Sequence, residues 1–151
     1  MAISHKNKAE NAIAWAMFLY KTDYKQNING ELGDLKSGFC CLGVGCHIFN
    51  VRYKKDDGTS TTFKSKVGLL EDIGGFHDPS DLSLSELAVP DKFRMRVYGR
   101  RDDYYSSLAD ANDRGASFKE IAKWISKRPE TLFHPKVATY IKDYFKDNPL
   151  K

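Results

Sequence analysis

An apolar block at residues 39–49 restricts what this chain can fold into more than any other feature of its sequence. It contains all three cysteines of the chain and two glycines, and hardly any polar side chain. A helix here would be apolar on nearly every side, because hydrophobic residues occupy two separate faces: Cys41, Val44 and Ile48 on one, and Leu42, Cys46 and Phe49 on the other. Such a helix must be covered by other elements, and its glycines allow a neighbouring backbone to approach closely. We therefore expect a central, buried helix.

The cysteines of this block have three possible roles: metal ligands, disulfide partners or buried packing residues. A structural zinc site usually takes two pairs of Cys or His ligands from separate turns, and the sequence has no second pair. The odd number of thiols and the adjacent positions of Cys40 and Cys41 fit a reducing compartment better than a disulfide framework. The sequence therefore favours buried thiols that behave as small hydrophobic side chains.

Catalysis by a cysteine is a further alternative, because Cys46 is followed by His47 and an imidazolium lowers the pKa of a nearby thiol. Adjacent residues on a helix point about 100° apart, so these two side chains cannot form the hydrogen bond that activation needs. No P-loop, dinucleotide-binding glycine pattern or HExxH motif is present either. We expect a protein that is not an enzyme and that uses no metal and no cofactor.

The composition is that of one globular domain covering residues 1–151. Hydrophobic residues make up 41% and charged residues 29% of the chain, and its length is close to the usual size of a single domain. No apolar run reaches the roughly 18 residues of a membrane span, and the first residues lack the apolar stretch of a signal peptide. We therefore expect a cytoplasmic protein with no membrane partner. The net charge of +4 is enough to attract phosphates but does not by itself indicate DNA binding.

The first third of the chain begins with an expected helix. Asn7, with Glu10 three residues later, is the expected cap of this helix. Its buried face is expected to contain Ala9, Ile13, Ala16 or Met17, and Tyr20. Residues 24–33 contain asparagine and glycine at positions typical of a loop or a short hairpin.

The middle of the chain is expected to supply the strands. A hairpin over residues 51–63 is predicted around Asp57 and Gly58, which suit a two-residue turn. Residues 67–87 are predicted to be mostly loop, with one helical turn near 69–72. Residues 93–98 alternate apolar and polar side chains and form the clearest predicted strand.

The last third of the chain is predicted to be helical. Gly115 is suited to end a helix that contains Asn112, and Ser117 with Glu120 forms a capping box for a helix from Phe118 to about residue 127. Ile121, Ala122 and Ile125 form the apolar face of that helix. Pro135 can begin a final helix with an apolar face of Val137, Tyr140, Ile141, Tyr144 and Phe145. Together these elements predict an α+β fold in which a small antiparallel sheet packs against an N-terminal helix, a buried Cys-rich helix and C-terminal helices.

Arginines and tyrosines alternate over residues 94–105, in the predicted strand and the segment that follows it. Arginine offers paired donors to a phosphate, and a tyrosine ring offers a flat face to a base. Such a surface suits a nucleotide, although a solvated strand face with cross-strand packing is an equally good interpretation. Asn112 is polar in an apolar helical face, so it either caps the end of its own helix or contacts a ligand.

Residues 115–122 also have features of the first helix of a helix-turn-helix. The segment that should be the turn, residues 127–135, is longer than the usual three or four residues and contains Pro129 and Pro135. DNA reading by this unit is therefore the less favoured interpretation.

Four blocks of the sequence taken together resemble a widespread set of small proteins from tailed bacteriophages. The blocks are Trp15-Ala16 with Tyr20; Tyr24-Lys25-Gln26 with Gly30 and Leu32; residues 39–44; and residues 112–122. They cover the first and last thirds of the chain, and residues 51–90 are not matched. Within this set the chain is similar to the Thoeris anti-defence sponge proteins, which bind cyclic ADP-ribose signals and silence a bacterial immune alarm. Gly45 departs from this pattern, which has a larger apolar residue at that position.

The resemblance implies a β-sheet core against two C-terminal helices, with ligand sites between subunits. It also implies capture of a small cyclic nucleotide without cleavage, by a homo-oligomer in the cytoplasm of an infected bacterial cell. The residues expected to bind the ligand are Arg94, Arg96, Tyr98, Arg101, Tyr105, Asn112 and Arg128. The alternative function is nucleic-acid binding or host takeover through the basic C-terminal helical region.

Overall fold

The computed structural model describes residues 4–28, 32–50, 108–113 and 115–151. In chain order its elements are α1 (His5–Lys21), β1 (Gly33–Asp34), β2 (Gly38–Phe39), α2 (Cys41–Ile48), α5 (Leu108–Asp113), α6 (Phe118–Lys127), the 3-10 helix η1 (Pro129–Thr131) and α7 (Pro135–Asp147). Helices at both ends of the chain and a two-stranded antiparallel sheet confirm the expected α+β class. The hairpin expected at 51–63, the helical turn near 69–72 and the strand at 93–98 lie outside the described residues.

Helix α1 begins about one turn earlier than the sequence predicts. Its N-cap is Ser4, whose hydroxyl oxygen accepts a hydrogen bond from the backbone N–H of Asn7 at 3.1 Å, so the cap expected at Asn7 is wrong. The buried face is also shifted, because Ile13, Met17 and Tyr20 of the predicted face are only partly buried. The fully buried residues of α1 are Ala9, Ala12, Trp15, Ala16 and Leu19.

A tight hairpin leads into the cysteine block. Strands β1 and β2 pair antiparallel, with Gly33 opposite Phe39 and Asp34 opposite Gly38. Gly33 and Gly38 have φ angles of 89° and 93°, and a Cβ on Gly33 would lie 1.9 Å from the carbonyl oxygen of Gly38. Only glycine adopts this left-handed conformation without strain, so the two glycines make the hairpin possible.

The cysteine block forms the buried helix α2, as the sequence predicts. Residues 41–46 are all buried. Cys40 is the N-cap, and its sulfur accepts a hydrogen bond from the backbone N–H of Gly43 at 3.3 Å. Gly43 packs so closely on the preceding chain that a Cβ there would lie 1.9 Å from the carbonyl oxygen of Leu32. The expected close approach of a neighbouring backbone is therefore confirmed at Gly43.

The C-terminal helices follow the predicted pattern. Gly115 lies just beyond α5 with a φ angle of 106°, and Ser117 and Glu120 form the predicted capping box of α6. The apolar face predicted for α6 is buried, and α7 begins at Pro135. In α7 the prediction is wrong at Tyr140, which is 47% exposed, because the buried face turns toward Ala138.

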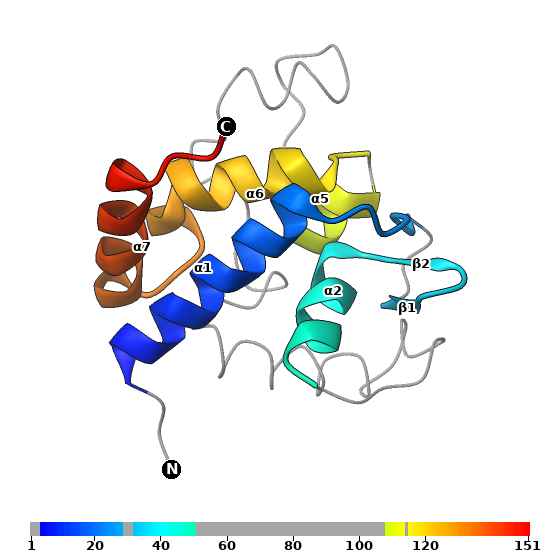
Figure 1. Ribbon diagram of the computed structural model, residues 1–151, viewed down its shortest axis with the longest axis horizontal. Helices are drawn as coiled ribbons and strands as arrows, with labels where there is room; N and C mark the ends of the chain where they lie inside the picture. Colours follow the sequence, from blue (N-terminus) through cyan, green and yellow to red (C-terminus); the bar gives the residue numbers. More distant parts are fainter. Residues whose placement is uncertain (1–3, 29–31, 51–107, 114) are drawn as a thin grey trace.

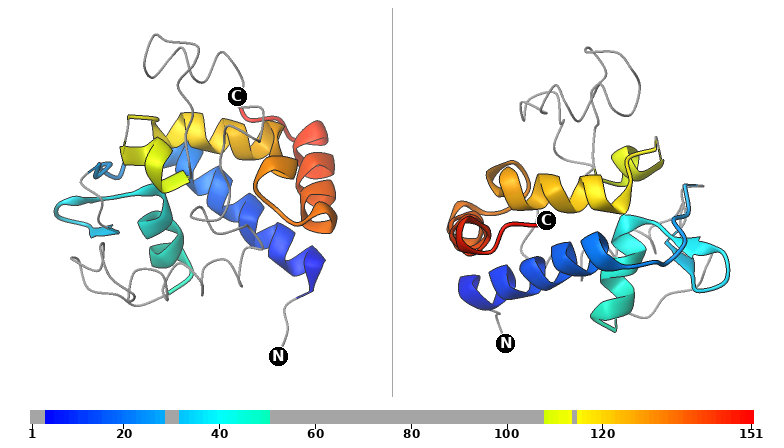
Figure 2. Two further views of the ribbon diagram at one scale, coloured as in Figure 1. Left: turned by 180° about the vertical axis from the view of Figure 1, so that it is seen from behind. Right: turned by 45° about the horizontal axis from the view of Figure 1, so that its top comes forward.

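Helix α1 is the element on which the others pack. Figure 1 shows α1 running diagonally, with α6 and α7 on one side and α2 on the other. The right-hand view of Figure 2, in which α7 is seen along its axis, shows the same arrangement. The indole N–H of Trp15 donates to the carbonyl oxygen of Cys41 at 3.1 Å and so joins α1 to α2 across the core. Among the described helices none is both long enough and apolar enough to cross a membrane.

Candidate functional site

Two of the residues expected to bind a ligand, Asn112 and Arg128, lie in the described part of the chain. Outside it lie Arg94, Arg96, Tyr98, Arg101 and Tyr105. Asn112 is at the end of α5, whereas Arg128 follows α6, and the 10 residues of α6 correspond to about 15 Å of helical rise. The structure therefore does not bring these two residues together.

Asn112 is fully buried and joins separate segments of the chain. Its Oδ1 accepts hydrogen bonds from the side-chain amide of Gln26 at 2.7 Å and from the backbone N–H of Cys41 at 3.0 Å. Its Nδ2 donates to the backbone carbonyl oxygen of Asn27 at 2.8 Å and to Oδ1 of Asp113 at 3.1 Å. An asparagine amide has two donors and two acceptor lone pairs, so its whole capacity is used within the chain. This structural role differs from both roles that the sequence suggested for Asn112, the helix cap and the ligand contact.

Arg128 is the C-cap of α6 and is only partly exposed. Its Nε donates to Oε1 of Glu130 at 2.7 Å, and Nζ of Lys142 lies 4.0 Å from the other carboxylate oxygen of Glu130. Partial burial acts to raise the pKa of Glu130, but a backbone hydrogen bond, Arg128 and Lys142 together lower it. The arginine thus contributes to an ion pair at the start of η1.

The three cysteines are buried thiols outside any disulfide, which confirms the interpretation that the sequence favours. Burial raises the pKa of Cys40 to about 12, and burial together with the neighbouring Cys40 raises the pKa of Cys41 well above its ordinary value. Such thiols stay protonated at neutral pH and are poor nucleophiles. Cys46 is buried whereas His47 is exposed, with its ring against aromatic neighbours. In the described ranges no three His, Cys, Asp or Glu side chains gather where they could hold a metal ion.

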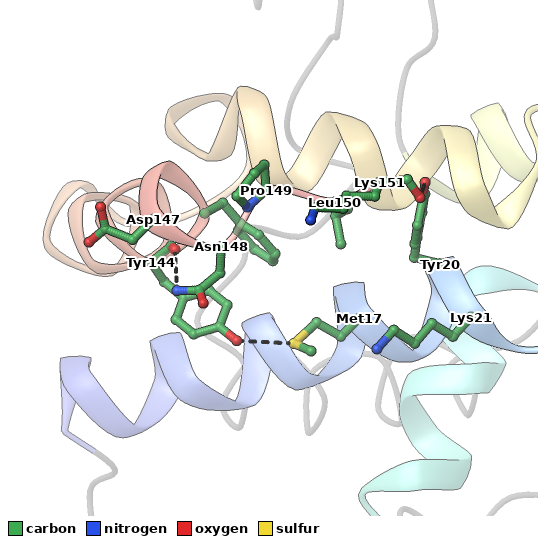
Figure 3. A pocket seen from close by; sticks show the side chains of 10 residues that line it. Met17, Tyr20, Lys21, Tyr144, Asp147, Asn148, Pro149, Leu150 and Lys151 are labelled. Carbon is green, nitrogen blue, oxygen red and sulfur yellow. Dashed lines mark hydrogen bonds between the residues drawn. The ribbon is translucent and has the colours of Figure 1, made fainter.

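A pocket of about 400 Å³ lies between the last turns of α1, the last turns of α7 and residues 148–151 (Figure 3). The rings of Tyr20 and Tyr144 line it together with apolar side chains such as Met17 and Leu150. Lys21 and Lys151 are among its charged lining residues, as is one carboxylate, Asp147. Sites for small organic ligands are usually about 300–1,000 Å³ in volume and combine apolar walls with a few polar groups. The volume of this pocket lies in that range, and its lining has both apolar and polar groups.

Hydrogen bonds fix the walls of this pocket. The hydroxyl of Tyr144 donates to the sulfur of Met17 at 3.5 Å, which joins α7 to α1. The backbone N–H of Asn148 donates to the carbonyl oxygen of Tyr144 at 2.9 Å, where the chain leaves the helix. The hydroxyl of Tyr20 donates to the carbonyl oxygen of Lys151, so residues 148–151 return to α1 and form one wall.

Two lysines of α6 lie over the ring of Tyr20. The Nζ atom of Lys119 is 5.5 Å and that of Lys123 is 6.0 Å from the ring centroid. Figure 3 shows Tyr20 extending from α1 toward α6, beside Lys151. Two ammonium groups therefore lie at the end of the pocket formed by Tyr20.

Sequence reasoning missed this pocket because each contributor has an ordinary local interpretation. Tyr20 fits the apolar face predicted for the first helix, and Lys119 and Lys123 belong to the polar face of an amphipathic helix. The four-residue spacing of the lysines places them on the same side of α6, and that spacing is the one signal that was available. Their position over Tyr20 depends on how α6 packs on α1.

Comparison of the chain with protein-family models, with curated proteins and with solved structures finds no match.

Proposed function

We propose that the protein captures a small cyclic nucleotide signalling molecule and holds it without cleaving it. In this function it acts as a phage anti-defence protein in the cytoplasm of an infected bacterial cell, like the Thoeris anti-defence sponge proteins that its sequence resembles. The observation that carries the proposal is the pocket formed by α1, α7 and residues 148–151. It combines two tyrosine rings with lysines in a volume of about 400 Å³.

The chemistry of this pocket suits a nucleotide. The rings of Tyr20 and Tyr144 offer flat surfaces on which a base can stack, and Met17 and Leu150 offer apolar contacts. Lysine ammonium groups attract phosphates as compact positive charges. A ligand that combines a base with phosphates therefore matches both parts of the lining.

Binding without cleavage is supported by the state of the cysteines. A thiolate would be the strongest nucleophile that this chain offers, but burial keeps Cys40 and Cys41 protonated. Sequestration needs no reaction, since it lowers the free concentration of a signal by mass action. It needs tight binding, which a preorganised pocket favours.

The proposal includes a homo-oligomer in which the arginines and tyrosines of residues 94–105 contribute to the ligand site. Arginine supplies paired donors that lysine does not have, and these suit phosphate oxygens. Replacing Arg96 or Arg101 with alanine is then expected to weaken binding by about 10- to 100-fold, the usual value of a charged hydrogen bond. Size-exclusion chromatography with light scattering determines whether the protein is an oligomer.

Isothermal titration calorimetry with cyclic ADP-ribose isomers and with cyclic di- and trinucleotides tests the function. Binding of one of these ligands, followed by its recovery intact after denaturation of the protein, is the expected result. Absence of binding to all of them would overturn the proposed ligand class. Recovery of a converted product would replace the sponge with an enzyme.

A second candidate function is nucleic-acid binding. Lys119, Lys123 and Lys127 recur every four residues and so follow one side of α6. A row of lysines can contact successive phosphates, and such contacts are lost as salt increases because they release counterions. A gel shift at low salt that disappears at higher salt would support this function, and the absence of any shift at low salt would remove it.

A further inference from the structure

We propose that Lys119, Lys123 and Tyr20 form a phosphate-binding site at the edge of the pocket. The site takes a phosphate group of an organic ligand whose flat part enters the pocket. This inference rests on the proposed function only in taking the ligand to be a nucleotide, because the site itself recognises the phosphate.

The first argument is the convergence of like charges. Both ammonium groups lie within 6.0 Å of the centroid of one ring, at 5.5 Å for Lys119 and 6.0 Å for Lys123. Among the described residues, neither lysine forms an ion pair with a carboxylate. The carboxylate that is nearest in sequence, Glu120, hydrogen-bonds to Ser117 in the capping box of α6.

The second argument compares the stabilising and destabilising effects at this position. An exposed cation over an aromatic ring gains roughly 0.5–1 kcal/mol from the negative face of the ring. Two ammonium groups that share a ring also repel each other, and at a solvent-exposed surface that repulsion is reduced by water and salt. An anion bound between Lys119 and Lys123 turns this repulsion into two attractive contacts, so the arrangement is suited to a phosphate.

The third argument is the connection between the lysines and the pocket. Tyr20 belongs to both, because its ring lies under Lys119 and Lys123 and also lines the pocket. Lys21 and Lys151 line the same pocket and add positive charge. Asp147 is the carboxylate of the lining and adds negative charge. A phosphate at the lysines would therefore be attached to an organic group directed toward Tyr144 and Leu150.

The competing explanation is that the lysine side chains only cover the ring of Tyr20. Lysine stems often pack along apolar surface while the ammonium stays in water. Under that explanation the two lysines contribute to packing and no specific anion is bound. The two explanations differ in whether loss of the charges changes phosphate binding.

The test is a titration of the full chain with pyrophosphate at low ionic strength, followed by ¹H–¹⁵N NMR. We expect shifts at Tyr20, Lys119 and Lys123, and an affinity that falls about tenfold or more in the K119Q/K123Q double variant, since each change removes a charged contact. Lys6→Gln is the control, because Lys6 is an exposed lysine in the first turn of α1, at the opposite end of that helix from Tyr20. It is expected to leave the affinity within about twofold of the wild-type value.

Two results would overturn the inference: equal affinities of the wild type and the double variant, or an equal loss in the Lys6→Gln control, which would indicate general attraction to a basic surface. The failure of this site and the failure of the proposed function are distinguishable. If pyrophosphate binds through the lysines but no cyclic nucleotide binds, the site stands and the function does not. If a cyclic nucleotide binds equally well to K119Q/K123Q, the function stands and the site does not.

A short single-stranded oligonucleotide tests the second candidate function. If it binds through the lysines when cyclic nucleotides do not, the site belongs to that function.

Discussion

The side-chain oxygen of Asn112 accepts a hydrogen bond from the backbone N–H of Cys41 at 3.0 Å, which joins the end of α5 to the start of the buried helix α2. The N–H groups of the first turn of a helix have no partner within the helix, and a buried one needs a partner elsewhere. The two residues are separated by 71 positions in sequence. This contact therefore closes a long loop while it satisfies a helix start that water cannot reach.

Replacement of Asn112 with alanine is expected to destabilise the protein by about 3 kcal/mol or more, since each buried polar group left without a partner costs about 1–3 kcal/mol. The Cys41 N–H and the Asn27 carbonyl oxygen lose this partner, whereas the Gln26 side chain keeps its hydrogen bond to the carbonyl oxygen of Ala116. Urea unfolding followed by circular dichroism measures the change. Asn7→Ala in the exposed first turn of α1 is the matched control and is expected to change stability by less than about 0.5 kcal/mol. A similar small change in both variants would contradict the structural role of Asn112.

Replacement of Gly43 with alanine is expected to destabilise the protein, although alanine is the better helix former by about 1 kcal/mol. The added Cβ would lie 1.9 Å from the carbonyl oxygen of Leu32, and backbone atoms on both sides would have to move apart. Alanine at this position is expected to lower the thermal unfolding midpoint by several degrees or more. An unchanged or raised midpoint would show that α2 and the segment at Leu32 are not in close contact.

The cysteines are expected to resist thiol reagents in the native protein. Burial raises the pKa of Cys40 to about 12, and only the thiolate form reacts readily. Ellman's reagent at pH 8 should therefore label fewer than one thiol per chain in buffer and all 3 in guanidinium chloride. Rapid labelling of the folded protein would mean that at least one sulfur is accessible and would reopen the possibility of a catalytic thiol.

The same burial makes stability sensitive to alkaline pH. The folded-state pKa of Cys40 is raised from 9.0 to about 12, so the unfolded chain loses a proton more readily than the folded one. The contribution of Cys40 to stability is fully present below pH 9.0 and is lost as the pH rises toward about 12. Urea unfolding at pH 8 and pH 10 is expected to show a smaller decrease in Cys40→Ala than in the wild type. Equal decreases in the two proteins would exclude Cys40 as a source of this pH dependence.

His5 and His134 are expected to make the packing of α1 on α7 sensitive to acid. Their rings are stacked with centroids 4.7 Å apart, and Nδ1 of His134 accepts a hydrogen bond from the backbone N–H of Lys136 at 3.2 Å. Reduced hydration, and then repulsion from His134, Lys136 and Lys8, lower the pKa of His5 from 6.5. A lowered histidine pKa means that the stability it contributes is present above pH 6.5 and is lost as the pH falls below that value.

Thermal unfolding at pH 7.5 and pH 5.5 tests this expectation. The unfolding midpoint of the wild type should fall more between these two values than that of His5→Gln, because glutamine does not titrate. His47→Gln is the control, since His47 packs against other rings, those of Phe39 and Tyr24. A decrease of the same size in His5→Gln and in the wild type would exclude the stacked pair as the acid-sensitive element.

Prediction from the sequence succeeded where the deciding interactions lie within a few residues of one another. The capping box of Ser117 and Glu120 fixes the start of α6, and Gly115 with its φ angle of 106° ends the preceding helix region. The start of α1 was predicted wrongly even though Ser4 and Asn7 are both good capping residues. Because both residues are suited to the cap, the local sequence does not decide between them.

The same distinction applies to the candidate site. The sequence places a polar amide in an apolar face at Asn112, but whether such an amide meets a ligand, its own helix end or another segment depends on what the fold brings to it. Here Gln26, Asn27, Cys41 and Asp113 together use its whole hydrogen-bonding capacity. The pocket beside Tyr20 is likewise built from two segments that are distant in sequence, residues 17–21 and residues 144–151.

By itself the sequence determined that the apolar block contains a buried helix with buried thiols, which is α2 (Cys41–Ile48), because a segment that is apolar on nearly every side has no stable position in water. It also determined the limits of α6, because caps and helical periodicity act over a few residues. Only the tertiary structure decided that Lys119 and Lys123 lie over Tyr20 and that residues 148–151 close a pocket against α1. The physical reason is that these contacts form only at the packing angles that α1, α6 and α7 adopt. The side chains of all three helices set those angles together.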